Sequence, residues 1–157
     1  VGLNEPDRRV TEGEWKKLFL RLKDSISQCL HDGAENIWEP GLSQLNCWHC
    51  RKNVPLPPKL VTTDASGKHF LLLNRNTKLL KRHIHPKASE LEDTTEIGQV
   101  VQNPANPDVW GIRNLTLTPW TITLAHGEMK EVPPQKSAPL TVGLKLNIAG
   151  YQAEIVP

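Results

Sequence analysis

Three cysteines carry the clearest chemical signal in this sequence, because two of them form a close pair and the third lies upstream. Cys47 and Cys50 are separated by two residues, a spacing that lets two thiolates on one tight turn point at a single metal ion. Cys29 supplies a third thiolate, and the residues after it offer an imidazole, His31, or a carboxylate, Asp32. Soft donors in two close pairs are typical of a tetrahedral zinc site. We predict that zinc binds Cys29, Cys47 and Cys50, with His31 favoured over Asp32 as the fourth ligand.

The predicted zinc ion has a structural role, since four protein donors leave no coordination position for water. Two other interpretations of the cysteines stay open: one disulfide with an odd thiol, or buried thiols that bind nothing. The N-terminal residues Val1 to Asn4 are followed by charged residues instead of the apolar run of a signal peptide. This pattern favours a reducing compartment, and we expect a cytoplasmic protein.

The composition sets few limits on the partner. The 157 residues carry a formal net charge of +2, which alone implies neither a nucleic-acid nor a membrane partner. No stretch approaches the roughly 20 apolar residues that span a membrane. All three cysteines lie in the first third, whereas the remainder is rich in Val, Ile, Leu, Thr and Pro. The predicted organisation is a metal-binding element at 1–53 and a larger domain at 59–157, and the missing initiator methionine suggests a piece of a longer protein.

A helix is predicted at the start of the first part. Thr11 and Glu14 form a capping box, in which each side chain accepts a hydrogen bond from the other residue's backbone. Apolar residues then recur at steps of three and four, so that one face of the helix is apolar. Gly33 is the expected stop, which places Cys29 at the helix end. Residues 54–58 are rich in proline, cannot continue a helix or lie in a central strand, and mark the boundary.

The second part contains many short segments with strand character, separated by turn residues. Residues 64–67, Asp-Ala-Ser-Gly, form a good hairpin loop. Because helical periodicity does not interrupt the series, we predict a mainly β fold class with an antiparallel β-sandwich. Trp110 and Trp120 are expected to fill the core between two sheets. The predicted strands span 59–63, 69–73, 78–84, 97–102, 110–115, 120–124, 128–132, 137–140, 145–148 and 152–156.

The later strands resemble the second half of a forkhead-associated domain. The resemblance is carried by the Trp-Gly-Ile-Arg-Asn-Leu-Thr run at 110–116, Trp-Thr-Ile-Thr at 120–123, Lys-Glu-Val at 130–132 and the glycine-bearing segment at 140–148. Residues 74–77 and 82–83 correspond to its first half. With the preceding helix and cysteine pair, the whole arrangement resembles the C-terminal region of a group of bacterial eukaryote-like serine/threonine kinases, without the kinase domain.

This resemblance implies a non-catalytic regulatory region that binds a protein partner or a phosphopeptide. Loops at one end of the sandwich would offer Arg75, Arg82, Asn114 and Thr116 to that partner. Nothing in the sequence resembles the glycine-rich phosphate loop or the catalytic loop of a kinase, and no serine lies in a nucleophile-elbow motif. We therefore do not expect an enzyme.

A basic segment supports the alternative of a nucleic-acid-binding zinc-ribbon protein. Its charge would suit a phosphate group of a phosphopeptide or of a nucleic-acid backbone. Trp48, beside the cysteine pair, would then stack on a base. A solvated strand whose charges protect a sheet edge is the simpler interpretation. The basic residues of this segment are Lys78, Lys81, Arg82, His83, His85 and Lys87.

Overall fold

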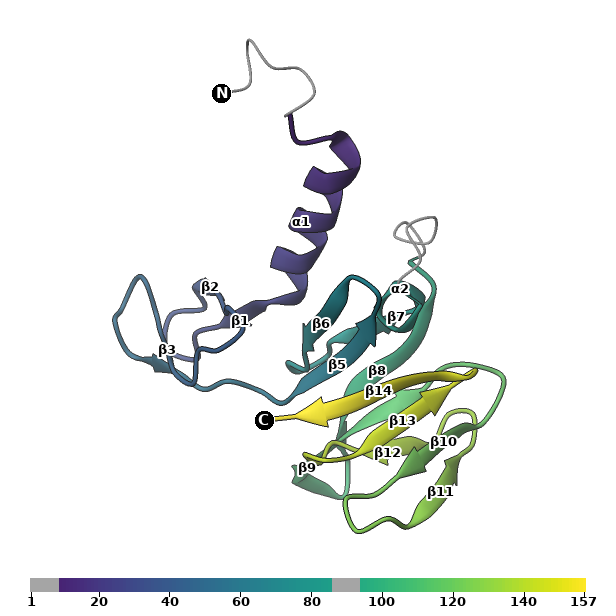
Figure 1. The fold of residues 1–157 in the computed structure, drawn as a ribbon. Helices are drawn as coiled ribbons and strands as arrows, with labels where there is room; N and C mark the ends of the chain where they lie inside the picture. The colour runs from purple at the N-terminus through teal and green to yellow at the C-terminus, as the bar shows by residue number, and fades with distance from the viewer. Residues whose placement is uncertain (1–8, 86–93) are drawn as a thin grey trace.

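The computed structural model describes residues 9–85 and 94–157 and shows a mainly β protein with an N-terminal helix (Figure 1). Helix α1 spans Glu12–Asp24, and the predicted capping box at its start is confirmed. Thr11 Oγ1 accepts a hydrogen bond from the Glu14 amide (3.3 Å), and the Glu14 carboxylate accepts one from the Thr11 amide (2.7 Å). The helix ends earlier than expected, with Ser25 as its C-cap. The placement of Cys29 at the helix end was therefore wrong.

The apolar stripe of α1 does not hold the helix against the rest of the described protein. No residue of α1 is buried, and Trp15 and Phe19 are 46% and 61% exposed. Their rings stack on each other, with centroids 5.7 Å apart. The helix contacts β6 (Gly67–Leu72), and it has a well-defined ionic contact near its C-terminal end: Asp24, in its last turn, accepts two hydrogen bonds of 2.7 Å from the Arg82 guanidinium. Figure 1 accordingly shows α1 projecting from the sheets, with its C-terminal end nearest to them.

Two short hairpins follow the helix, and we call residues 25–54 the cysteine element. Strand β1 (Ile26–Gln28) pairs with β2 (Glu35–Ile37), and β3 (Leu45–Asn46) pairs with β4 (Asn53–Val54), both antiparallel. Trp38 is 4% exposed and meets the ring of Phe70 edge-on at 5.4 Å. The Asn74 side chain donates to the Ile26 carbonyl oxygen (2.9 Å). The cysteine element is thus packed directly on the larger part of the chain.

The larger part consists of two antiparallel sheets. In the first, the strand order is β11-β10-β13-β14-β5-β6, and in the second it is β12-β9-β8-β7. The strands of the first sheet are β5 (Lys59–Asp64), β6 (Gly67–Leu72), β10 (Trp120–Thr123), β11 (Met129–Val132), β13 (Lys145–Ile148) and β14 (Tyr151–Val156). Those of the second are β7 (Lys78–Leu80), β8 (Glu96–Asn103), β9 (Asn106–Asn114) and β12 (Ser137–Pro139). The predicted hairpin at 64–67 is confirmed, with Asp64 opposite Gly67.

One apolar core joins the two sheets. It includes Leu60, Leu146 and Ile155 from the first sheet and Val100 and Ile112 from the second. The expectation for Trp120 is confirmed, because its side chain is 1% exposed in this core and its indole N–H donates to Thr116 Oγ1 (3.2 Å). Trp110 packs against the same core and is half-buried.

The predicted strand over 78–84 is only partly correct. Strand β7 ends at Leu80, and a single helical turn, α2 (Lys81–Ile84), follows it. The turn is closed by a hydrogen bond from the His85 amide to the Lys81 carbonyl oxygen (3.0 Å). The His83 ring caps its start, since Nδ1 accepts a hydrogen bond from the Leu80 amide (3.0 Å). His83 and His85 therefore do not alternate along one strand face.

Within residues 9–85 and 94–157, neither helix combines the length and the apolar character needed to cross a membrane.

Candidate metal centre

Two turns of the same geometry hold the candidate ligands. In the first, the Cys29 amide donates to the Ala34 carbonyl oxygen, and the Gly33 amide donates back to the Cys29 carbonyl oxygen. In the second, the Cys47 amide donates to the carbonyl oxygen of Lys52, and the Arg51 amide donates back to that of Cys47. The residue that follows the second ligand position has a positive φ in both turns, 74° at Gly33 and 64° at Arg51. Such a turn aims the first and the fourth side chain at one point.

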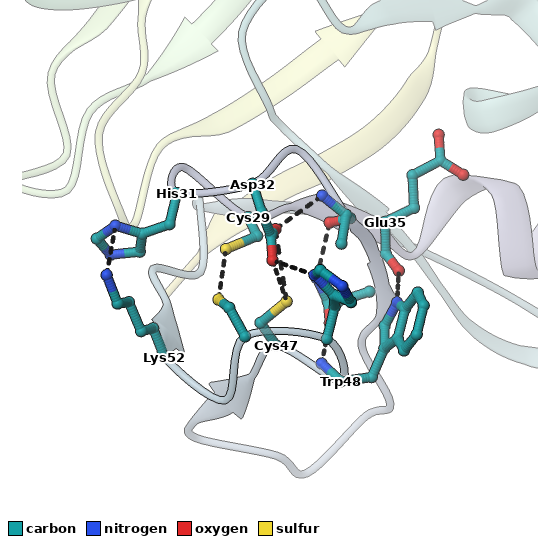
Figure 2. A network of polar contacts seen from close by, with 11 residues as sticks. Cys29, His31, Asp32, Glu35, Cys47, Trp48 and Lys52 are labelled. Atoms are coloured by element: carbon teal, nitrogen blue, oxygen red, sulfur yellow. Dashed lines mark hydrogen bonds and ion pairs between the residues drawn. The ribbon is translucent and has the colours of Figure 1, made fainter.

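The two turns bring four candidate donor groups together (Figure 2). The Cys29 and Cys50 sulfurs lie 3.6 Å apart, and the Cys47 sulfur lies 3.6 and 3.7 Å from the two Asp32 oxygens. All four ligand atoms lie within 4.8 Å of one another. The cysteines are free thiols, of which those of Cys29 and Cys47 are buried. The residues of the cluster are Cys29, Asp32, Cys47 and Cys50.

The spacing fits a small tetrahedral ion. Zinc–sulfur bonds of about 2.3 Å give a tetrahedron whose sulfur–sulfur edge is about 3.8 Å, and carboxylate oxygens are accepted zinc ligands. The observed separation of 3.6 Å between the Cys29 and Cys50 sulfurs is close to that edge. Three thiolates and one carboxylate carry four negative charges, so a divalent cation is the species that such a set would hold. The structure thus shows a possible metal site.

The shifted pKa values of two thiols in the cluster indicate how a bound cation would change their protonation. Burial raises the pKa of the Cys47 thiol, but the backbone N–H groups of Cys50 and His49 outweigh burial and lower it. The Lys52 backbone lowers the pKa of Cys50, yet burial and the adjacent Asp32 and thiol groups raise it to about 11. One thiolate is therefore favoured while its neighbour keeps its proton. A metal ion would displace that proton and remove the repulsion.

Asp32 is held in place by groups outside the cluster. Its carboxylate accepts a hydrogen bond from the Ala34 amide (3.0 Å) and lies 2.9 Å from Nδ1 of His49. These contacts, first the Ala34 amide and then His49, lower the pKa of Asp32 well below its usual range. An ionised and oriented carboxylate is what a metal ligand requires.

The fourth position of the cluster differs from the sequence prediction. His31 points away from the sulfurs, and its Nδ1 lies 3.5 Å from the Lys52 ammonium (Figure 2). Asp32 stands three residues after Cys29, as Cys50 stands three after Cys47, so the repeated turn selects the carboxylate. The geometry therefore favours Asp32 as the fourth donor and does not support the preference for His31. The equal spacing of Cys29–Asp32 and Cys47–Cys50 was the signal from which Asp32 could have been chosen.

The four expected partner-binding residues have three separate sets of contacts. Arg75 is exposed and its guanidinium lies over the Trp110 ring, 5.4 Å from the centroid. The Arg82 side chain is 7% exposed and is paired with Asp24. Asn114 is fully buried and donates to the carbonyl oxygens of Thr118 and Val132.

Thr116 belongs to the same loop network as Asn114. Its amide and its hydroxyl both donate to Asn114 Oδ1, at 2.8 and 2.7 Å. These bonds fix the loop after β9 and hold the Trp120 indole at the core. Asn114 and Thr116 thus have a structural role in this loop, and Arg75 is the one of the four that faces solvent.

The basic segment is partly neutralised. Lys78 pairs with Glu96, and Arg82 and His83 both contact Asp24. The His85 ring lies on Tyr151, with centroids 4.0 Å apart. Lys87 lies outside the described residues. Arg82 and His83 are therefore buried and paired side chains of a helical turn, and they do not belong to a solvated strand edge.

The two tryptophans of the cysteine element have different environments. Trp38 is buried, and its indole N–H donates to the Leu42 carbonyl oxygen (2.9 Å). Trp48 is 62% exposed although two hydrogen bonds fix it, from its amide to Asn36 Oδ1 and from its indole to the Glu35 carbonyl oxygen (Figure 2). Trp48 is thus an aromatic ring held at the surface, which is the exposure that base stacking, considered from the sequence, would require.

Comparison of the chain with protein-family models, with curated proteins and with solved structures finds no match.

Proposed function

We propose that the cysteine element is a zinc ribbon and that the chain is a non-catalytic protein-interaction region of a bacterial serine/threonine kinase. The metal part of the proposal is carried by one observation, the gathering of three thiols and a carboxylate within 4.8 Å on two turns of equal geometry. The core of the cysteine element is small: Trp38, Leu45, Val54 and the two buried cysteines, with Leu72 from β6. Zinc binding would supply the folding free energy that so few apolar side chains cannot.

The kinase part of the proposal is supported by the order of elements. A helix, a cysteine element and two antiparallel sheets follow one another as in the kinase regions that the sequence resembles. The two sheets would correspond to a forkhead-associated-like sandwich. In that arrangement the chain contributes binding rather than chemistry.

A groove between the cysteine element and the second sheet is the surface that we assign to the protein partner. It has a volume of about 700 Å³, within the range of ligand sites, and combines prolines 55, 57 and 58 with Trp110 and Leu140. Arg75 lines the same groove and is exposed. The occupant that we assign is an extended partner segment whose apolar side chains meet the prolines and Leu140 and whose acidic or phosphorylated side chain pairs with Arg75 beside Trp110. Glu35 and Asp108 also line the groove, so the attraction for an acidic side chain is local to Arg75.

Binding of a phosphothreonine peptide library to the intact chain, against the same library without phosphate, tests this assignment. We expect the phosphorylated peptides to bind more tightly and Arg75→Ala to abolish the difference. Arg113→Ala is the matched control, because Arg113 is also exposed but does not line the groove. Equal affinity for both libraries would remove the phosphate-dependent form of the proposal.

Native mass spectrometry of the purified chain tests the metal part. We expect one zinc ion per chain, and loss of that ion when a chelator is added. The same spectrum gives the oligomeric state. A fully folded species that never carries metal would contradict the proposal, and the cysteines would then be packing residues.

A second candidate function is nucleic-acid binding through the cysteine element. The observation that favours it is the rigidly held, exposed Trp48 ring, followed by the exposed residues Arg51 and Lys52. Bases stack on such rings, and cations contact the phosphates. A labelled single-stranded oligonucleotide should then bind with an affinity that falls steeply with salt and is lost in Trp48→Ala. Binding that is absent, or indifferent to salt, would exclude this function.

A further inference from the structure

A hollow between α1 and the β5–β6 hairpin lies apart from both the metal centre and the groove at Arg75. Its volume is about 140 Å³. Apolar side chains from the helix and from the hairpin form a large part of its wall: Leu20, Leu60, Phe70 and Leu71. An apolar cavity of about 150 Å³ in an engineered protein accommodates a benzene ring. The hollow is therefore large enough for one ring-sized apolar group.

The charges around this hollow are predominantly positive. Lys17 and Arg21, one helical turn apart on α1, line it from the exposed side. Neither side chain forms a hydrogen bond or a close ion pair with another residue in the part of the chain that the structure describes. The Arg21 carbonyl oxygen accepts a hydrogen bond from Ser25 Oγ (2.9 Å), and the Lys17 ammonium interacts with the Glu14 carboxylate only at longer range. Of the described residues that line the hollow, Asp24 is the one carboxylate, and its charge is matched by Arg82.

The deeper polar groups add donors rather than acceptors. Arg82 uses one N–H of each terminal nitrogen on Asp24, which leaves three of its five N–H donors. The Arg82 and His83 side chains are 7% and 6% exposed. The hollow is therefore lined by buried polar side chains as well as by the exposed Lys17 and Arg21.

The hollow does not have the geometry of a hydrolase site. Ser66 and His69 line it, and Asp64 is close to both. However, Ser66 Oγ (3.1 Å) and Asp64 Oδ1 (3.0 Å) approach the same ring nitrogen, Nε2 of His69. A catalytic triad requires the serine and the carboxylate on opposite nitrogens. The arrangement supports binding rather than catalysis.

We propose that this hollow is a binding site for a small amphipathic anion. The ring-sized apolar group of the ligand lies against Leu20, Phe70 and Leu71, and its anionic head lies between Lys17 and Arg21. The ligand is either a free small molecule or a side chain of a partner protein, since both sources can present this chemistry. The hollow shares no lining residue with the metal cluster or with the partner groove, so ligand binding here can be tested separately from both.

Titration calorimetry on the intact, metal-replete chain with four probes tests the proposal. Phenyl phosphate carries the ring and the head, benzoate a ring with a smaller head, benzyl alcohol the ring alone, and inorganic phosphate the head alone. We expect phenyl phosphate and benzoate to bind at least about tenfold more tightly than either half-probe. If inorganic phosphate binds as tightly as phenyl phosphate, the apolar wall has no role and the proposal is overturned.

Variants locate the site. Lys17→Ala and Arg21→Ala, both at exposed helix positions, should each weaken phenyl phosphate at least about fivefold, whereas Lys16→Ala on the same helix should have no effect, because Lys16 does not line the hollow. Leu20→Trp, which fills the hollow from a half-buried position, should remove binding while the thermal unfolding midpoint stays near that of the wild type. Unchanged affinity in the Lys17 and Arg21 variants would contradict the proposal.

A peptide that contains phosphotyrosine distinguishes the two sources of the ligand. If the peptide binds more tightly than free phosphotyrosine, the ligand is a side chain of a partner protein, and if free phosphotyrosine binds more tightly, the ligand is a free small molecule.

Discussion

At the scale of single residues, Asp32 is the most informative position. The turn at Cys29 reproduces the hydrogen bonds of the turn at Cys47, so the Asp32 carboxylate takes the place that a second cysteine has in the other turn. A carboxylate is a harder donor than a thiolate, and it is held here by Ala34 and His49. The affinity of the site for zinc should therefore depend on Asp32 and be insensitive to His31.

Substitutions at these two positions make a direct test. We expect Asp32→Ala to weaken zinc binding by at least about tenfold, or about 1.4 kcal/mol, because a ligand is lost. Asp32→Cys should bind zinc at least as tightly as the wild type, and His31→Ala should bind it equally well. Competition with a chromophoric chelator measures all three. A loss of affinity in His31→Ala that matched the loss in Asp32→Ala would return His31 to the ligand set.

His49 allows a test of the contact behind the ligand. Its ring nitrogen lies 2.9 Å from the Asp32 carboxylate and does not belong to the four-residue cluster. Groups that orient a ligand in this way change metal affinity by about 10- to 100-fold when they are removed. We expect His49→Ala to lose zinc affinity in this range without loss of stoichiometry in the same chelator competition. An unchanged affinity would mean that the Ala34 amide alone orients Asp32.

At the scale of elements, two glycines allow close approaches: Gly98 between the two sheets, and Gly111 between two paired strands of the second sheet. A Cβ atom at Gly98 of β8 would lie 2.8 Å from the Trp120 ring, and one at Gly111 of β9 would lie 2.7 Å from the Ala138 carbonyl oxygen. Neither neighbour can move freely, because Trp120 is buried in the core and Ala138 belongs to the backbone of β12. The pairing of β9 with β12 thus requires a residue without a side chain.

Gly111→Ala should therefore destabilise the protein by about 1–3 kcal/mol, the usual cost of an overpacked site. Gly98→Ala should fall in the same range. Gly13→Ala is the matched control, because a Cβ atom there meets nothing within 4 Å and alanine favours the helix. Urea unfolding of the three variants measures the free energies. A neutral Gly111→Ala would show that β12 can move away from β9.

The elements also show which parts of the fold a sequence can predict. Strands flanked by clear turn residues, such as β5, β8 and β13, were predicted within one or two residues, and the capping box at Thr11 was predicted as well. Strands β1 to β4 have two or three residues each, too few to show a period. The end of α1 was missed because apolar residues continue at helical spacing beyond Asp24, whereas the helical backbone ends at that residue.

The candidate site was predictable to a similar degree. The three cysteines came from spacing alone, and Asp32 could have been chosen from the equal spacing of the two turns. Arg82 and Asn114 could not be excluded as partner residues from the sequence, because their roles depend on Asp24, Thr118 and Val132. Those contacts form only when the chain is folded.

At the scale of the whole molecule, one buried ion pair joins the helix to the sheets. The Asp24 carboxylate is 12% exposed and meets the guanidinium of Arg82 and Nε2 of His83. Burial raises the pKa of Asp24, but the hydrogen bonds from His83 and Arg82 outweigh burial and lower it.

Removal of one partner of such a buried pair costs about 3–5 kcal/mol. We expect Asp24→Asn to approach this loss in free energy of unfolding, measured with urea. The control is Glu12→Gln, at an exposed position of the same helix, which should change the free energy of unfolding by about 0.3 kcal/mol.

The same group of residues predicts how stability depends on pH. Burial lowers the pKa of His83, so between that lowered value and about 6.5 the unfolded chain binds the proton and the folded protein does not. Stability should therefore fall as the pH decreases below about 6.5. It should fall again below about pH 4, as Asp24 and other carboxylates with lowered pKa values take up protons. Urea unfolding from pH 8 to pH 4 measures the loss of stability below about pH 6.5, and His83→Gln should remove that loss. A wild-type stability that does not change between about pH 7 and pH 5 would contradict the assignment to His83.

The mode of attachment of α1 has a mechanical consequence. A 13-residue helix is about 20 Å long, and it is fastened near one end by charges while its aromatic stripe remains open to the surroundings. The helix is thus a rigid element whose orientation depends on the contact between Asp24 and Arg82. Protonation of the Asp24 carboxylate would remove the charge that holds the Arg82 guanidinium, and the direction in which the helix leaves the sheets would then be less strongly fixed.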